Sequence, residues 1–209
     1  MPLLPNIHPL TDALYQPYDI GQVGQLDLHI LSELFGGDAA ARDLTPAWNG
    51  GIYWAGMRRS ATTPAAQNNT NALALFYLSE WKSANSARAF AQLYATELGR
   101  KYSGLKPDLA AQKAAKPDWP EGTEEQIFTT NEGPVLITTR GKQVFVAESF
   151  PLDLARKLTT LILDAQGTGE LRMAQANPPE TLSSGIVRFF SDAGVMKAAV
   201  QAALHAVPR

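Results

Sequence analysis

The sequence predicts an α+β domain, with helices packed on a mostly antiparallel sheet of about five strands and a further helix near the C-terminus. Three segments support this prediction: a strand followed by a helix over residues 72–98, a run of short strands over 126–148, and an amphipathic helix over 153–165. The chain has 209 residues, of which 45% are hydrophobic, enough to bury the core of one large domain.

The N-terminal part contains four prolines before its first helical pattern. We expect residues 1–18 to form an extended lead-in, because those prolines interrupt regular structure. The spacing of apolar residues then predicts a first helix from about Ile20 to Phe35, which the two glycines at 36–37 end. Asp38 is a suitable cap for a short second helix over residues 39–44.

Asp27 falls inside the apolar arc of the predicted first helix. One hypothesis is that it is a buried carboxylate suited to acid–base chemistry. The alternatives are that the helix begins only near residue 25, or that Asp27 pairs with an arginine. The sequence leaves these alternatives open.

The centre of the predicted sheet is the segment 73–78, which is apolar at every position. A strand with one solvated face would alternate instead, so this strand is expected to lie in the centre of a sheet. A strand over 52–57 precedes it, separated by a polar loop. Ser83 is a suitable N-cap for the helix that follows and ends near Leu98.

The second half of the chain opens with a proline-containing surface connection over residues 100–125, with one helical turn around 109–115. Glycine-containing turns then separate three short strand signals, which predicts an antiparallel meander. These strands are expected at Gln126–Thr130, Val135–Thr139 and Gln143–Glu148. A helix from Asp153 to Ala165 follows them.

The expected organisation is therefore a lead-in (1–18), an α+β core domain (19–166), a Gly/Pro/Ser-rich linker (167–184) and a C-terminal helical appendage (185–209). We expect the last helix to dock on the core domain. The alternative is that this helix serves as an arm that binds a partner.

Composition excludes several classes of function. The net charge is −2, the pI is about 5.9 and no cluster of Lys and Arg is present, so nucleic acid is not an expected partner. The chain lacks cysteine, so it has no disulfide framework and no thiolate chemistry. No glycine-rich phosphate loop is found, and we expect no cofactor. No apolar run is long enough for membrane insertion.

The N-terminal residues lack a signal-peptide pattern. The absence of cysteine nevertheless fits a domain that is exported from a bacterium, with its leader already removed. We therefore expect a periplasmic or extracellular location, with the cytoplasm as the alternative. The oligomeric state is not predicted by the sequence.

His29 and Glu33 are the weak candidates for a metal site, because residues one helical turn apart can both ligate one ion. They also share a helix stripe with two glutamines, which is typical of a solvated face. No HExxH motif or comparable cluster is found. We therefore predict neither a metal site nor catalytic residues from this pattern.

Aromatic residues provide the candidate ligand site. If the strand at 52–57 pairs with the central strand, its aromatic residues can approach Trp81, with arginines nearby, and such a wall can stack a planar or sugar ligand. The alternative, which we favour, is that the tryptophans fill the end of the sheet core. The candidate ligand-binding residues are Trp48, Tyr53, Trp54, Arg58, Arg59 and Trp81.

Two segments resemble an uncharacterised bacterial domain over about residues 20–165. That domain has a W-x-G-D-[RK]-Y turn, which corresponds to WNGGIY at 48–53, and a W-D-[ST]-x-x-[DE]-A-x-x-F junction, which corresponds to WKSANSARAF at 81–90. Gly51 and Lys82 stand where the pattern has acids, so a site that used those acids is lost here. The resemblance implies an exported bacterial protein. Some such proteins also carry zinc-peptidase-like segments, but the peptidase signature is absent from this chain.

The sequence thus favours a non-enzymatic domain that binds a partner or ligand, or serves a larger assembly. The first alternative is a hydrolase whose site is assembled from dispersed residues, with Asp27, His29 and Glu33 as contributors. The second is a small-ligand carrier that uses the aromatic wall. The burial of the tryptophans and the surroundings of Asp27 and His29 distinguish these hypotheses.

Overall fold

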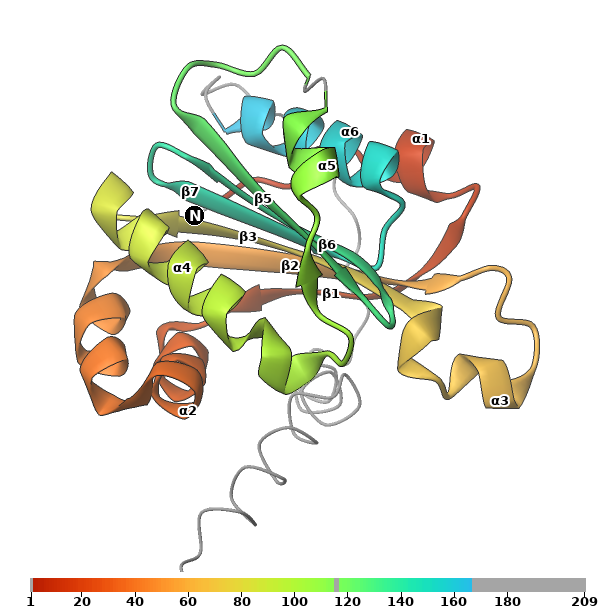
Figure 1. The fold of residues 1–209 in the computed structure, drawn as a ribbon, viewed down its shortest axis with the longest axis horizontal. Helices are drawn as coiled ribbons and strands as arrows, with labels where there is room; N and C mark the ends of the chain where they lie inside the picture. The colour runs from red at the N-terminus through yellow and green to blue at the C-terminus, as the bar shows by residue number, and fades with distance from the viewer. Residues whose placement is uncertain (1, 115–116, 167–209) are drawn as a thin grey trace, which may run out of the picture.

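A computed structural model describes residues 2–114 and 117–166 as an α+β fold built on one antiparallel sheet (Figure 1). The seven strands lie in the order β1-β2-β3-β7-β6-β5-β4. Their bounds are β1 Tyr15–Val23, β2 Trp48–Arg58, β3 Leu73–Trp81, β4 Lys106–Pro107, β5 Thr123–Thr130, β6 Gly133–Arg140 and β7 Gln143–Glu148. The helices are α1 His8–Thr11, α2 Gln25–Leu44, α3 Pro64–Gln67, α4 Ala84–Lys101, α5 Leu109–Lys113 and α6 Leu152–Ala165.

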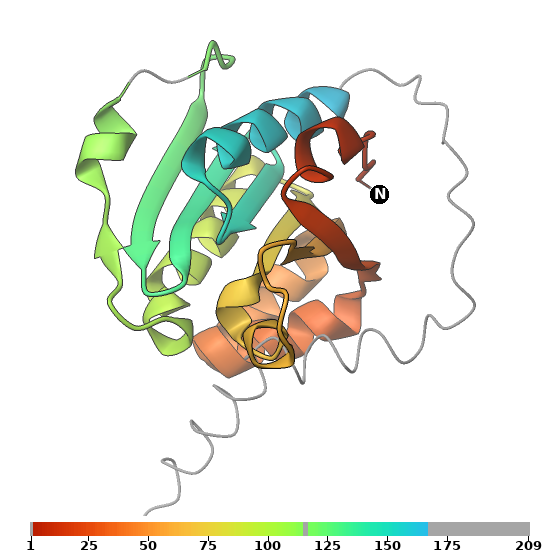
Figure 2. The ribbon, with the colours of Figure 1, turned by 90° about the vertical axis from the view of Figure 1, so that its right-hand side faces the viewer.

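Helices cover both faces of the sheet, as Figures 1 and 2 show. On one face, α6 and the N-terminal segment around Ile7 pack on side chains of β2, β3 and β7. On the other face, α2 and α4 cover residues of β3, β6 and β7. Two separate apolar cores result, so every central strand needs apolar side chains at consecutive positions.

The strand β3 shows this requirement directly. Ala74, Phe76 and Leu78 enter the core beneath α6, while Tyr77 and Trp81 pack in the core beneath α4. Its neighbours are β2 and β7, both antiparallel. The prediction that 73–78 is a central strand is confirmed.

The helix α4 begins as the sequence indicates. The Ser83 hydroxyl oxygen accepts a hydrogen bond from the Ser86 amide at 3.0 Å, which satisfies an otherwise unpaired N–H of the first turn. Phe90 then packs on Trp81, with a distance of 4.9 Å between ring centroids. The helix is thus fixed to the end of β3 by one polar cap and one aromatic contact.

The prediction of an antiparallel sheet flanked by helices is confirmed, but the prediction of five strands was too low. The meander β5–β6–β7 and the helix α6 lie where the sequence indicates, and β1 and β4 were missed. β4 has only two residues, too few for any periodicity. β1 contains Pro17, which argues against a strand in a local pattern but is tolerated at a sheet edge.

The first helix was predicted five residues too early. Ile20 lies in β1, opposite Trp54, and α2 begins at Gln25. Residues 2–18 also differ from the extended lead-in expected over 1–18, since they contain α1 and the start of β1. The strand β1 forms by pairing with β2, which is distant in sequence, and a local helical period cannot indicate such pairing. This explains why residues 15–23 were not predicted as a strand.

α2 contains the break that the two glycines suggested. Gly37 has φ 77°, a left-handed conformation that glycine adopts without strain, and the two parts of α2 meet there at a kink. The predicted linker over 167–184 and the helical appendage over 185–209 lie outside the described residues. Whether that appendage docks on the core domain stays a prediction.

Candidate functional site

The open edge of the sheet is the feature from which we build the candidate site. Within the described residues, β1 has a strand neighbour on one side only, which is β2. A register shift between Pro17 and Asp19 bends the first half of β1, and from Asp19 to Val23 the pairing with β2 is regular. Over Asp19–Val23 the backbone groups on the outer side of β1 therefore have no strand neighbour within the described residues, and the Ile20 amide donates to the Asp19 carboxylate at 2.8 Å. Such an edge is one to which another strand can add.

The opposite edge is protected. β4 pairs with the end of β5 at Lys106 and Pro107, and α5 lies next to β5. The Ile127 carbonyl accepts hydrogen bonds from the Asp108 amide at 2.8 Å and from the Gln112 side-chain amide at 3.0 Å. These contacts satisfy backbone groups of β5 that would otherwise be exposed, so the two edges of the sheet differ.

Exposed apolar side chains flank the open edge on both faces of the sheet, since Ile20 lies opposite Trp54 on the face of α6, whereas Leu26 and Ile30 belong to α2 on the other face. Five of the six large apolar residues that are exposed in the described part of the chain lie between residues 14 and 30. We call this set the β1–α2 surface; it comprises Leu14, Tyr18, Ile20, Leu26 and Ile30, with exposed fractions of 47–70%. Figure 1 shows β1 along the rim of the sheet with α2 beside it. Grouped exposed apolar residues of this kind are typical of an interaction surface.

The turn from β1 into α2 places two carboxylates beside this surface. Asp27 accepts a hydrogen bond from the Gly24 amide at 2.7 Å and so caps the first turn of α2. Asp19 accepts a hydrogen bond from the Tyr53 hydroxyl at 2.9 Å. Burial, the hydrogen bond to Asp19 and the charges of Asp19 and Asp27 all raise the pKa of Tyr53, which keeps it neutral. The explanation that α2 begins near residue 25 is confirmed.

His29 and Glu33 lie on the exposed side of α2. His29 Nε2 and Glu33 Oε2 are 3.6 Å apart, and His29 Nδ1 lies 3.1 Å from the Thr45 hydroxyl. Asp27 is directed instead to the amide of Gly24. No group of three or more His, Asp or Glu side chains that could hold a metal ion occurs within residues 2–114 and 117–166.

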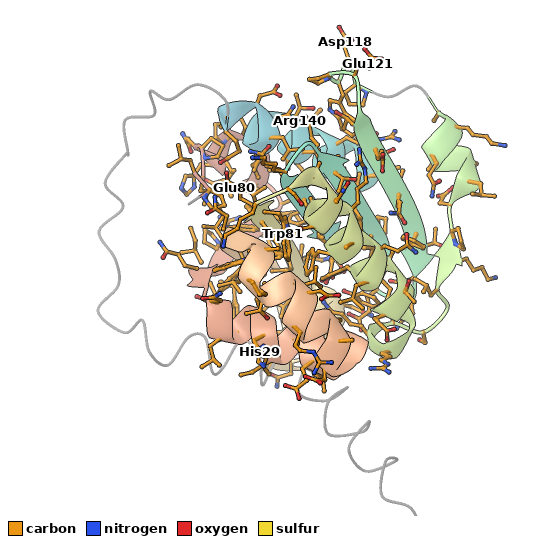
Figure 3. The ribbon with its side chains drawn as sticks, turned by 90° about the vertical axis from the view of Figure 1, so that its left-hand side faces the viewer. His29, Glu80, Trp81, Asp118, Glu121 and Arg140 are labelled. Atoms are coloured by element: carbon orange, nitrogen blue, oxygen red, sulfur yellow. The ribbon has the colours of Figure 1, made fainter. Side chains whose placement is uncertain are left out.

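The candidate aromatic residues are divided between the two faces of the sheet. Trp54 lies beneath α6, stacked on Phe76 with 5.7 Å between ring centroids. Trp48 and Trp81 are opposite each other in the β2–β3 register and lie on the face of α2 and α4, where Figure 3 shows Trp81 between those helices. Trp54 and Trp81 are both buried, so they do not form one wall along a cleft.

Trp81 belongs to a buried polar network at the end of β3. Its indole N–H donates to the Ser79 hydroxyl at 3.0 Å, and that hydroxyl faces the Val144 carbonyl at 3.4 Å. The Tyr77 hydroxyl lies near Trp48 and Ser79 without good hydrogen-bond geometry to either, and burial raises the pKa of Tyr77 to about 12. Packing therefore explains both tryptophans, and Ser79 satisfies the indole N–H of Trp81, whereas the buried indole nitrogen of Trp48 has no hydrogen-bond partner within the described residues.

The two candidate arginines bind backbone carbonyls. Arg58 donates to the carbonyls of Asn71, at 3.1 Å, and of Ser149, and its guanidinium lies 5.9 Å from the ring centroid of Tyr15. Arg59 donates to the Asp12 carbonyl at 2.7 Å. Both side chains therefore connect β2 to other segments. The role of the aromatic and arginine residues in ligand binding stays a prediction.

A buried carboxylate that sequence reasoning missed lies at the end of β7. Glu148 is 2% exposed and accepts hydrogen bonds from the hydroxyls of Tyr94, at 2.5 Å, and Tyr102, at 2.6 Å, and from the ammonium of Lys101. All three donors belong to α4 or its C-cap. The alternation of side chains along β7 could have indicated this burial, because Glu148 lies on the same face as the buried Val144 and Val146.

The charge state of this cluster follows from its contacts. Burial alone would raise the pKa of Glu148, but Lys101 and the two tyrosine hydroxyls outweigh it, so the pKa of Glu148 lies below its usual 4.5. Burial and the neighbouring carboxylate hold the pKa values of Tyr94 and Tyr102 well above 10.0. The carboxylate is therefore ionised and the tyrosines are neutral near pH 7, which suits an anchor for α4.

An open groove of about 1040 Å³ lies on the outer side of α6. Pro5, Pro9 and Leu10 line one wall, and Lys157, Leu161 and Asp164 belong to the other. None of the candidate aromatic residues and none of the Glu148 cluster lines this groove. This groove is thus separate from the candidate aromatic residues and from the Glu148 cluster, whereas Arg156, which pairs with Glu125, lies in its lining.

The residues that carry the resemblance have structural roles. Trp48 and Trp81 are cross-strand partners, Ser83 caps α4 and Phe90 packs on Trp81. At Gly51, where the resembled pattern has an acid, a Cβ atom would lie 2.7 Å from the Tyr77 hydroxyl. Tyr77 therefore occupies the space that an acid would need, and an aspartate does not fit unless this side chain moves.

The fold and the β1–α2 surface define the class of this chain: an α+β domain with one protected and one open sheet edge. Comparison with protein-family models, with curated proteins and with solved structures yields no match. No helix within the described residues combines the length and the apolar character that crossing a membrane requires.

Proposed function

We propose that this chain is a non-enzymatic binding or assembly domain of an exported bacterial protein, and that the β1–α2 surface recognises its protein partner. The observation that carries the proposal is the concentration of exposed apolar side chains in one stretch of the chain, residues 14–30. A monomeric domain gains nothing from placing Leu26 and Ile30 in water, whereas a bound partner buries them.

The backbone beside these side chains supports the same function. β1 lies at the rim of the sheet, and its outer side offers N–H and C=O groups for which the described residues contain no strand neighbour. A partner can therefore gain both backbone hydrogen bonds and apolar burial at one place. The export proposal is supported by the absence of cysteine and by the resemblance at residues 48–53 and 81–90.

A selection with random peptides tests the proposed surface. Peptides displayed on phage are enriched on the intact protein, on a Leu26→Ser/Ile30→Ser variant and on a Leu109→Ser control, which changes the remaining large exposed apolar residue, on α5. We expect the Leu26→Ser/Ile30→Ser variant to bind the selected peptides at least about tenfold more weakly, a loss of about 1.4 kcal/mol. Circular dichroism verifies that each variant folds.

The control defines the opposite outcome. Leu109 is 60% exposed and lies on the protected side of the sheet, so its replacement removes apolar area without touching the β1–α2 surface. Equal binding by wild type and Leu26→Ser/Ile30→Ser would contradict the proposal. Loss of binding in Leu109→Ser alone would place recognition at the other edge. Detection of the native protein in periplasmic, secreted and cytosolic fractions tests export separately.

A further inference from the structure

We propose that the partner contributes an extended segment with alternating apolar and basic residues, which adds as an antiparallel or parallel strand to the open edge of β1. This inference rests on the proposed function and specifies its partner. It uses three features of the described chain: the free backbone of β1, the β1–α2 surface and the distribution of charge. The distribution of charge distinguishes a basic partner from a second copy of this chain.

Charge in the N-terminal part of the chain is of one sign. Residues 2–41 contain five acidic residues and no lysine or arginine, although the whole chain has a net charge of only −2. The five acids are Asp12, Asp19, Asp27, Glu33 and Asp38. Asp38 pairs with Arg42, whereas no lysine or arginine ion pair with the other four occurs within the described residues. The Val23 end of β1 and the first turns of α2 are thus acidic, whereas Arg58 and Arg59 lie at the Tyr15 end of β1 and Arg100 donates to the Leu34 carbonyl of α2.

This charge disfavours a second copy of the chain as the occupant. Antiparallel pairing of β1 with β1 of another copy would bring two sets of the same acids together, with no arginine or lysine of residues 2–41 to offset them. Like charges across an interface oppose association, and opposite charges favour it. A segment rich in lysine and arginine therefore matches this surface better than the chain matches itself.

The geometry indicates where the basic residues of the partner would lie. Asp19 and Asp27 both act on the Tyr53 hydroxyl, so the two carboxylates converge where β1 passes into α2. Glu33 extends this acidic zone along α2, one helical turn beyond His29. At the other end of β1, Arg58 and Arg59 bind carbonyls. We therefore expect the basic side chains of the added strand to lie on the face of Asp19, toward α2 and its acids, and the alternate apolar side chains to lie on the opposite face, beside Ile20.

Pro17 and the irregular pairing at Asp19 limit the length of the added strand. Natural edge strands use proline and such irregularities to prevent indiscriminate pairing. Here they leave the segment Asp19–Val23 regular. An added strand would thus pair over a short length and depend on side-chain contacts for specificity, which makes its sequence composition a testable property.

The test uses two matched peptide libraries and the intact protein. Both libraries contain nine-residue peptides with alternate positions drawn from Val, Ile, Leu, Phe and Tyr; the other positions are Lys or Arg in one library and Glu in the second. We expect the basic library to bind at least about tenfold more tightly at low salt and to weaken as salt rises. N-methylation of alternate amides on one edge of the best peptide should abolish binding, because strand addition needs those N–H groups.

Variants of the protein locate the charges. Asp19→Asn/Asp27→Asn/Glu33→Gln keeps the acceptor oxygens of the β1–α2 turn and removes the charge, and we expect it to weaken binding of the basic peptides by about tenfold. Asp118→Asn/Glu121→Gln is the matched control. Figure 3 shows these two acids at the far end of the molecule from His29, which lies on α2. The control should bind as wild type does.

Each result has a distinct meaning. Equal binding of the two libraries at a surface sensitive to Leu26→Ser/Ile30→Ser would overturn the basic partner and leave the proposed function standing. Undiminished binding of the N-methylated peptide would overturn strand addition. If neither library binds while randomly selected peptides bind at the β1–α2 surface, the result would contradict the basic, strand-adding partner and leave the proposed function standing. If no peptide of any library binds at this surface, the inference and the proposed function fail together.

Discussion

Glu148→Ala is expected to lower the free energy of unfolding by about 3–5 kcal/mol, because it leaves buried donors without their acceptor. The carboxylate of Glu148 accepts hydrogen bonds from the hydroxyls of Tyr94 and Tyr102 and from the ammonium of Lys101; Tyr102 is buried, whereas Tyr94 and Lys101 are partly buried. These three groups fix the second half of α4 to the end of β7. Urea denaturation followed by tryptophan fluorescence measures the loss.

Two variants calibrate this prediction. Glu148→Gln keeps a carbonyl oxygen for one tyrosine but removes the charge beside Lys101, so we expect an intermediate loss of about 2 kcal/mol. Glu124→Gln removes an exposed carboxylate that pairs with Arg88 at 3.3 Å and should cost less than about 1 kcal/mol. A Glu148→Ala protein as stable as Glu124→Gln would show that the cluster does not anchor α4.

The dependence of this loss on pH follows from the direction of each shift. The folded-state pKa of Glu148 lies below 4.5, so its contribution is present above pH 4.5 and is lost as the pH falls through the folded pKa. The pKa values of Tyr94 and Tyr102 are raised above 10.0, so their contribution is present below pH 10.0 and is lost as the pH rises beyond it. The difference between wild type and Glu148→Ala should therefore be constant between these limits and shrink outside them.

Arg156→Ala should also destabilise the fold by about 3–5 kcal/mol, since it leaves Glu125 as an unpaired buried carboxylate. Arg156 on α6 donates from Nε to one Glu125 oxygen at 3.0 Å and from Nη2 to the other at 2.8 Å. It also donates to the Ala111 carbonyl of α5 at 2.9 Å. One side chain thus joins α6, β5 and α5, with the Glu125 side chain fully buried.

The double variant separates the charge from the packing. Glu125→Leu/Arg156→Met removes both charges and keeps most of the volume, so we expect its stability to lie within about 1 kcal/mol of wild type. Arg42→Ala, which breaks an exposed pair with Asp38, is the control and should cost less than about 1 kcal/mol. If the double variant is as unstable as Arg156→Ala, the loss comes from packing and not from an unpaired charge. Thermal and urea unfolding both measure these differences.

The elements that were predicted from the sequence are those whose structure is determined by residues close to one another in the chain. The strand around Phe76, the cap at Ser83, the meander over β5–β7 and the helix α6 all have local patterns that match their structure. Each is a case in which periodicity, turn residues and capping agree. The bounds differ from the predicted ones by at most a few residues, as expected where helix and strand ends depend on tertiary contacts.

The parts that the sequence missed depend on partners far along the chain. β1 pairs with residues of β2 that lie 28–43 positions later, and no local pattern around Pro17 indicates that pairing. The donors to Glu148 lie 46–54 residues before it. A carboxylate at a strand end is usually solvated, so only its place in the alternation of β7 distinguishes it.

The candidate site shows the same division. Trp81 was predicted to fill the sheet core in preference to a ligand cleft, and it is fully buried and bonded to Ser79. Leu26 and Ile30 are among the apolar residues whose spacing predicts the first helix, but that spacing does not indicate which of those residues face solvent. That assignment needs the position of α2 relative to the sheet, which β1 sets. The β1–α2 surface could therefore not be predicted before β1 was placed.

Amide hydrogen exchange of the intact protein, with and without the tightest peptide from the basic library, tests the central claim most directly. If that peptide adds as a strand to the open edge, the amides of β1 that do not bond to β2 should gain protection, above all within Asp19–Val23. Protection should also appear in the first turns of α2, and the Asp118→Asn/Glu121→Gln control should show the same pattern. Protection confined to the groove beside α6, or unchanged exchange throughout β1 in the saturated complex, would contradict the claim.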